Sequence, residues 1–175
     1  MKDLSLYTLD LVQNSLRAEA NFVQITVKDS IRRNRLEIII EDNGFGMDSA
    51  LLSKVTEPFV TTRTTRQTGM GIPLFKMAVE LTGGTFRIDS TPGKGTTLRG
   101  VFVRSHIDMP PLGDMSETIV TLVQGSPDVD FLYTYETDEQ TSRFDTKEIK
   151  ETLEDIPINT PDVLNWIREH LQETL

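Results

Sequence analysis

The 175-residue chain has no cysteine, which excludes disulfide bonds, thiolate chemistry and cysteine-ligated zinc. It has only two histidines, His106 and His170, and their wide separation favours surface positions over a shared metal site. No run of about 18 apolar residues occurs, and the acidic start MKDLSLYTLDLVQ lacks the basic beginning of a secretory signal. We therefore expect a cytoplasmic protein without a membrane partner.

Positive charge is also scarce. The chain carries 18 lysines and arginines against 27 aspartates and glutamates, a formal net charge of -9. Because nucleic acids bind clustered positive charge, this composition argues against a nucleic-acid partner. Apolar residues make up 37% of the chain, which is enough for the core of one domain with at most a small appendage.

The first part of the chain alternates helical and extended patterns. The expected elements are a helix over 4–20, strands over 22–27 and 36–40, a short helix over 47–55, a helix over 72–81 and strands over 85–90 and 96–103. Each pair of strands is expected to form an antiparallel hairpin. This order predicts a two-layer α/β sandwich, with helices covering one face of an antiparallel or mixed sheet.

Prolines and a glycine in 105–116 mark a linker, so we divide the chain into residues 1–104, this linker and a small α+β extension over 117–175. In the extension we expect strands over 118–123 and 131–135, a helix after Asp145 and a last helix starting at Thr160-Pro161. The apolar stripe of this last helix includes Trp166. Packing on neighbouring strands is the favoured interpretation of the stripe, and a partner-binding face is the alternative.

The segment Asp42-x-Gly44-x-Gly46 places a carboxylate at a strand end, followed by glycines that allow a ligand to approach the backbone closely. Turn geometry alone also explains such a motif. A carboxylate in this position can accept a hydrogen bond from an exocyclic amine such as that of adenine, and a buried acceptor rejects ligands without that donor.

Asp10 and Asn14 are four residues apart and share one face of the first helix, with Arg17 three residues further along. The stripe could be an ordinary solvated surface. As a functional site, it would use Asn14 as an oxygen ligand of Mg2+, Arg17 would face phosphates, and Asp10 would orient or deprotonate an acceptor.

Residues 61–71 are rich in threonine and carry two arginines just before a helix start near Gly71. Amide donors and the helix dipole converge at such a start, which suits phosphate. A mobile surface loop with incidental arginines is the other interpretation.

The motifs form a joint pattern. An asparagine on the first helix is followed in order by DNGFGM, TEPFVTTR, TGMGIPLFK and GGTFRIDSTPGKGTTL. The chain from about Leu4 to Val103 thereby resembles the ATP-binding domain shared by sensor histidine kinases, type II topoisomerases, the heat-shock chaperone ATPase and the mismatch-repair clamp ATPase, the GHKL superfamily. The resemblance implies an α/β sandwich of the Bergerat type, with nucleotide between helices and sheet.

The resemblance also implies roles for residues that match the family motifs. Asn14 matches the Mg2+-binding asparagine and Arg17 the basic residue after it. The remaining matches are Asp42 for adenine, with Gly44, Gly46 and Met47 of the same motif, then Thr62 and Arg63 of the kinase phenylalanine motif, Gly69, Met70 and Gly71 at the end of the ATP lid, and Thr96 near adenine.

Two departures from the family pattern affect the expected activity. Asp10 stands where hydrolysing members carry glutamate as general base and many histidine kinases carry asparagine, so its shorter side chain leaves the base role open. The lid is short, and no dimerisation helix pair with a phosphoacceptor histidine precedes the match. We therefore do not expect a histidine kinase that phosphorylates itself.

The sequence as a whole predicts an ATP- and Mg2+-binding protein that resembles histidine-kinase catalytic domains or anti-sigma-factor kinases. It would phosphorylate or regulate a partner protein supplied in trans. An ATP-gated binding module without phosphoryl transfer and a slow ATPase are the alternatives, and homodimerisation stays open.

Overall fold

The structure is a computed structural model that describes residues 2–56 and 70–174. Its elements are α1 (Leu4–Arg17), β1 (Phe22–Ser30), β2 (Arg35–Asp42), α2 (Ser49–Val55), α3 (Gly71–Leu81), β3 (Thr85–Thr91), β4 (Gly95–Val103), α4 (Met115–Gly125), β5 (Asp130–Thr137), β6 (Thr141–Asp145), α5 (Thr146–Leu153) and α6 (Pro161–Thr174). None of the helices in these residues combines the length and apolar composition needed to cross a bilayer.

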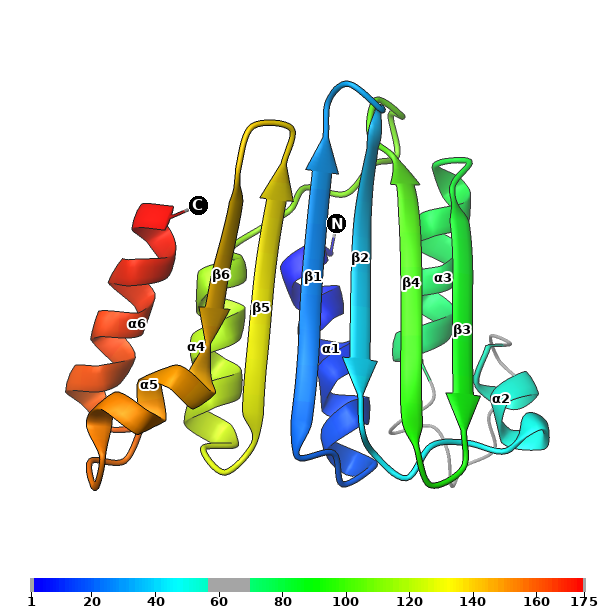
Figure 1. The fold of residues 1–175 in the computed structure, drawn as a ribbon. Coiled ribbons are helices and arrows are strands. Elements are labelled where there is room, and N and C mark those ends of the chain that lie inside the picture. Colours follow the sequence, from blue (N-terminus) through cyan, green and yellow to red (C-terminus); the bar gives the residue numbers. More distant parts are fainter. Residues whose placement is uncertain (1, 57–69, 175) are drawn as a thin grey trace.

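The strands form one mixed sheet in the order β3-β4-β2-β1-β5-β6. Neighbouring strands are antiparallel except β1 and β5, which run parallel. Helices α1, α3 and α4 lie against one face of this sheet, and α6 stands beside α4 beyond β6 (Figure 1). The predicted α/β sandwich with helices on one face is confirmed.

Alternation of side chains along the strands explains this layering. In β1, the buried Val23, Ile25 and Val27 point toward the helices, as every second residue of a strand shares a face. The helix α3 contributes Phe75, which is fully buried and makes edge-to-face contacts with the rings of Tyr7, Phe86 and Phe102 at centroid distances of 5.9, 6.2 and 5.6 Å. These contacts fix α3 on the sheet beside α1.

The residues after 115 continue the same sheet and the same core. Strand β5 pairs with β1 from Phe22↔Asp130 to Asp29↔Thr137, and its buried Phe131 and Tyr133 belong to the core cluster of the first part. The predicted linker also contacts the rest of the molecule, because the first backbone amides of α1, of Leu4 and Ser5, donate to the carbonyls of residues 111 and 112. The division of the chain into residues 1–104, a linker over 105–116 and an extension over 117–175 stays a prediction.

One predicted element of the extension is wrong. Residues 118–123 were expected to form a strand because of their β-branched run, but they lie in the helix α4. Asp114 caps this helix by accepting a hydrogen bond from the amide of Glu117. Met115, Ile119 and Leu122 are buried at helical spacing, so packing overrides the strand preference of the individual residues.

A buried carboxylate lies on the sheet face opposite the helices. Glu37 is 2% exposed, and it accepts hydrogen bonds from Arg35 Nη2 at 2.6 Å and from Arg99 Nε at 3.1 Å. Burial by itself would raise the pKa of Glu37, but the hydrogen bond from Arg99 and the positive charges of Arg99, Arg35 and Lys28 outweigh it, so the pKa lies below its ordinary value.

We predict that Glu37→Gln lowers the free energy of unfolding by about 1–3 kcal/mol at pH 7, because hydrogen bonds to a charged acceptor are lost. A carboxyl group whose pKa is lower in the folded than in the unfolded protein stabilises the fold when it is ionised. This stabilisation is complete above the ordinary pKa of 4.5 and is lost as the pH falls through the folded-state pKa. Urea unfolding should therefore show a smaller difference between variant and wild type at pH 3 than at pH 7.

The control is Asp89→Asn, which removes an exposed ion pair with Arg87 and should change stability by less than about 1 kcal/mol. An effect of Glu37→Gln that is equally large at both pH values would contradict the assigned ion pairs.

Candidate functional site

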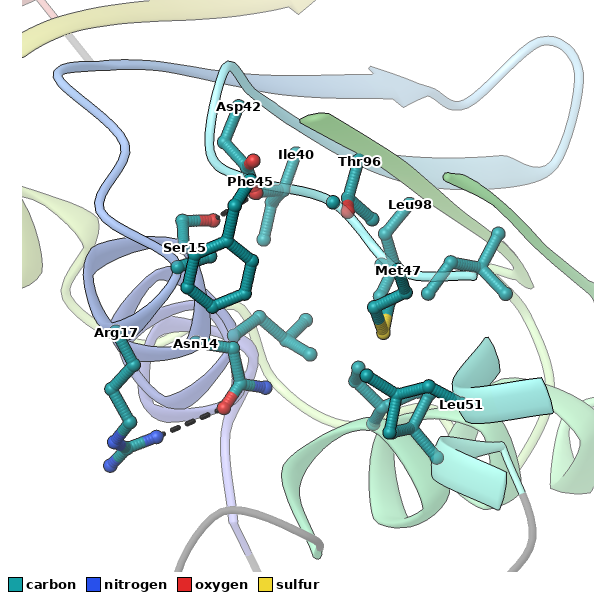
Figure 2. A pocket seen from close by; sticks show the side chains of 16 residues that line it. Asn14, Ser15, Arg17, Ile40, Asp42, Phe45, Met47, Leu51, Thr96 and Leu98 are labelled. Atoms are coloured by element: carbon teal, nitrogen blue, oxygen red, sulfur yellow. Dashed lines mark hydrogen bonds between the residues drawn. The ribbon is translucent and has the colours of Figure 1, made fainter. Parts of the chain in front are cut away.

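A cavity of about 250 Å³ lies between α1, α2, α3 and the ends of β2 and β4 (Figure 2). Its walls are mostly apolar, with a few polar side chains. It is lined by Leu11, Asn14, Ser15, Arg17, Ala18, Ile40, Asp42, Phe45, Gly46, Met47, Leu51, Val55, Ile72, Ile88, Thr96 and Leu98. The fold thus brings together six of the residues that the sequence analysis selected: Asn14, Arg17, Asp42, Gly46, Met47 and Thr96.

Asp42 ends β2, and its carboxylate is held from two directions. Oδ1 accepts a hydrogen bond from the amide of Gly44 at 2.9 Å, and Oδ2 accepts one from Ser15 Oγ at 2.6 Å. Ser15 is 3% exposed and was not selected by the sequence analysis. The only feature of the sequence that could have identified Ser15 is its position, a hydroxyl on the buried side of an amphipathic helix. The carboxylate therefore keeps one orientation beside the cavity, as Figure 2 shows.

The two glycines after Asp42 are required by close backbone contacts. Gly46 has φ 72°, and a Cβ there would lie 2.1 Å from the carbonyl oxygen of Thr91. A Cβ on Gly44 would lie 2.7 Å from the carbonyl oxygen of Ala18, at the end of α1. Gly44 supports the loop from behind and does not line the cavity, whereas Gly46 does.

Thr96 occupies the cavity wall formed by β4. Its hydroxyl shares a hydrogen bond of 2.8 Å with Ser90 Oγ, which also accepts from the amide of Met47 at 2.8 Å. Ser90 thus connects the glycine loop with β3 and β4. The sequence analysis missed Ser90, because only the pairing of the strands brings it next to Met47.

The polar end of the cavity contains Asn14 and Arg17. Arg17 Nη1 donates to Asn14 Oδ1 at 3.0 Å, while the buried Asn14 Nδ2 has no partner within the described residues. Figure 2 shows the amide nitrogen turned toward the cavity and the oxygen turned toward Arg17. A buried donor without an acceptor costs about 1–3 kcal/mol, which makes this amide a natural contact for a ligand.

Asp10 lies one turn before Asn14 on α1, and its carboxylate forms an ion pair with Lys2. The ammonium group of Lys2 also lies 4.9 Å from the centre of the Tyr7 ring. Asp10 does not line the cavity in this arrangement.

The start of α3 lies against the same polar face of α1. A Cβ on Gly71 would meet Asn14 Nδ2 at 3.6 Å and the Cβ of Asp10 at 3.7 Å, and Met70 occupies the N-cap position without a side-chain cap. The start of α3, where the first backbone amides have no partner within the helix, therefore lies next to Asn14. Thr62, Arg63 and Gly69 lie outside the described residues.

Comparison with known proteins bears on the family and the fold of the chain. Residues 2–107 match the family described as "Histidine kinase-, DNA gyrase B-, and HSP90-like ATPase". The sensor protein kinase FleS of Pseudomonas aeruginosa is 38% identical over 88 residues, which is 50% of this chain and 22% of that protein. The cell-division control histidine kinase PdhS of Brucella ovis is 29% identical over 120 residues, 61% of this chain and 12% of that protein.

Among solved structures, the Aquifex aeolicus MutL ATPase domain complexed with ADP superposes with a TM-score of 0.54 and 14% identity, covering 87% of this chain and 69% of that one. This likeness shows the fold. The chain spans less than a quarter of the length of the two curated relatives. Since the family match covers more than half of the chain, it belongs to the histidine kinase-, DNA gyrase B- and HSP90-like ATPase family.

Proposed function

We propose that the cavity binds ATP and that the protein transfers the terminal phosphoryl group to a partner protein. The observation that carries the nucleotide assignment is the carboxylate of Asp42, held by Ser15 and Gly44 beside an otherwise apolar cavity. The family match and the ADP complex of the MutL neighbour support the same assignment.

The adenine ring fits the apolar part of the cavity, between Ile40, Met47 and Leu98. Each oxygen of Asp42 already accepts one hydrogen bond, and a carboxylate oxygen can accept a second one from the exocyclic amine of adenine. The volume of about 250 Å³ is below the roughly 300–1,000 Å³ of pockets that enclose a whole ligand. The phosphates would therefore extend past Asn14 toward the start of α3.

At the phosphate end, Arg17 and the first amides of α3 supply positive charge and donors for a triphosphate. Asn14 would hold Mg2+ through its amide oxygen, which requires Arg17 to release this oxygen and the unpartnered amide to turn. No group of three or more acidic or histidine side chains in residues 2–56 and 70–174 offers another metal site. Bound Mg2+ would offset phosphate charge.

Asp10 is the residue that we assign to the acceptor group of the partner protein. Its carboxylate would orient or deprotonate the attacking group, provided that Lys2 leaves its ion pair with Asp10. A cytoplasmic location and a homodimer remain predictions.

One observation favours a second function, an ATP-gated binding module or slow ATPase without phosphoryl transfer to protein. Asp10 pairs with Lys2, and the oxygen of Asn14 accepts a hydrogen bond from Arg17. ATP binding would break the contacts of Asp10 with Lys2 and of Asn14 with Arg17. The resulting change at α1 would alter a contact with another protein without any phosphoryl transfer.

Asp42→Asn should weaken ATP binding about 100-fold or more, because an acceptor-only group is replaced by an amide with two donors. Isothermal titration calorimetry measures the affinity, and circular dichroism should show an unchanged fold. Asp89→Asn is the matched control on the exposed face and should bind ATP normally. If Asp42→Asn bound ATP as tightly as the wild type, the proposed adenine site would be wrong.

Ser15→Ala should lower ATP affinity by about 5- to 10-fold, since one hydrogen bond that orients Asp42 is lost. Binding of inorganic tripolyphosphate, which has no adenine, should not change. Ser53→Ala removes an exposed hydroxyl on α2 and serves as control. If Ser15→Ala weakened both ligands equally, Ser15 would not act through adenine recognition.

Asp10→Asn should reduce phosphoryl transfer by about 100-fold or more while ATP affinity changes by only a few fold. The assay uses ATP labelled in the terminal phosphate and proteins that co-purify with the chain. Labelling of a partner by wild type supports the kinase. ATP binding without any labelled partner favours the second function, and phosphate release then separates the slow ATPase from the gated module.

A further inference from the structure

An apolar groove is lined by residues of α5 and α6. These two helices lie beyond β6, the strand at one edge of the sheet (Figure 1). The volume of the groove is about 520 Å³, and it is lined by Ile149, Thr152, Leu153, Asp162, Val163 and Trp166. Trp166 is 48% exposed, and Ile156 in the connection between the two helices is 55% exposed. Contiguous apolar surface of this kind is typical of binding sites.

The groove is not a by-product of the packing of α6. Leu164, Ile167 and Leu171 are buried and hold α6 in the core, next to α4. Trp166 and Val163 lie on a neighbouring stripe of the same helix and line the groove instead. The favoured interpretation of the apolar stripe as core therefore covers only part of α6.

Trp166 is oriented within this surface. Its ring stacks on the ring of His170 with centroids 4.9 Å apart and an interplanar angle of 7°. A large aromatic side chain that is already ordered loses little conformational entropy on binding, and such residues dominate the binding energy of many interfaces.

The groove lies in the acidic part of the molecule. Residues 117–175 contain 14 of the 27 acidic residues and 4 of the 18 basic residues of the chain. Asp162 lines the groove, Glu154 and Asp155 directly follow Leu153, and Glu169 is one turn after Trp166. These four carboxylates form no ion pair within the part of the chain that the structure describes.

Three of the four basic residues in this part of the molecule are already paired: Arg143 with Asp145 and Glu148, Lys150 with Asp130, and Arg168 with Glu117. The fourth, Lys147, forms no ion pair among the described residues, and its single positive charge is outnumbered by the four unpaired carboxylates. The rim of the groove thus keeps a net negative charge around an apolar floor.

We propose that this groove binds a basic amphipathic segment of a partner protein. An apolar side chain of the segment inserts beside Trp166, and flanking lysines or arginines pair with Asp155, Asp162 and their acidic neighbours. This function goes beyond ATP binding and does not depend on it, because the groove is lined by α5 and α6, whereas the cavity of Asp42 is lined by other elements and shares no residue with it.

The probe is a synthetic helical peptide of about 14 residues made of leucine and lysine, with the leucines on one face. One matched peptide has glutamate in place of every lysine, and another has the same composition in scrambled order. Trp166 is the only tryptophan of the chain, so its fluorescence reports on the groove directly. The basic peptide should bind saturably and shift the emission, the acidic peptide should bind about 100-fold more weakly or not at all, and the scrambled peptide should bind about 10-fold more weakly.

Variants locate the site by the anisotropy of a labelled peptide. Trp166→Ala should weaken binding about 10-fold or more, whereas Ile107→Ala, which removes a 92% exposed side chain outside the groove, should have no more than about a 2-fold effect. The double change Asp155→Asn and Asp162→Asn should weaken binding about 10-fold and reduce its salt dependence. Glu80→Gln with Asp108→Asn is the charge-matched control.

Thermal melting followed by circular dichroism shows whether each variant folds, and ATP affinity should be unchanged in all of them. The proposal is overturned if no peptide binds, if acidic and basic peptides bind alike, or if the groove and control variants lose the same affinity. If Asp42→Asn lost ATP binding but still bound the peptide, the groove would be shown to bind its ligand independently of the ATP site.

Discussion

Helix α1 has to bury one stripe of side chains against the sheet while it keeps a polar stripe at the edge of a cavity. Leu4, Leu11 and Val12 form the buried stripe, and this placement turns Ser15 toward the end of β2 and Asn14 toward the start of α3. Both polar contacts of the candidate site depend on that single rotation of α1 about its axis. A shift by one residue would separate them, since neighbouring residues on a helix point about 100° apart.

The polar side chains of α1, at and next to the cavity, are already paired with one another or with Lys2, so a ligand there has to exchange these contacts. Asp10 is bound by Lys2, and Asn14 by Arg17. A triphosphate with its cation would compete for all four side chains at once. Under the proposed function, affinity and any turnover would be coupled to the release of Lys2 and Arg17, and the same exchange would transmit the presence of a ligand to the beginning of α1.

The chain extends the family core through one parallel strand. Because β5 pairs with β1 along its whole length, the last 60 or so residues share the sheet and core of the first part, yet they hold 14 of the 27 acidic residues and only 4 of the 18 basic ones. The cavity near Asp42 and the groove near Trp166 thus lie on different elements of one molecule. Under the two proposals, this separation would allow a nucleotide and a protein partner to be bound at the same time.

Local patterns in the sequence determined the elements of the first part, the loop glycines and six of the sixteen residues that line the cavity, because helical spacing, caps and turn residues act within a few positions. Only the tertiary structure decided that Ser15 holds Asp42, that residues 118–123 are helical, and that β5 lies parallel to β1. These features depend on contacts between distant segments, where burial outweighs the preferences of single residues. The Glu37 ion cluster is of the same kind, since Arg99 reaches it only after β2 and β4 have paired.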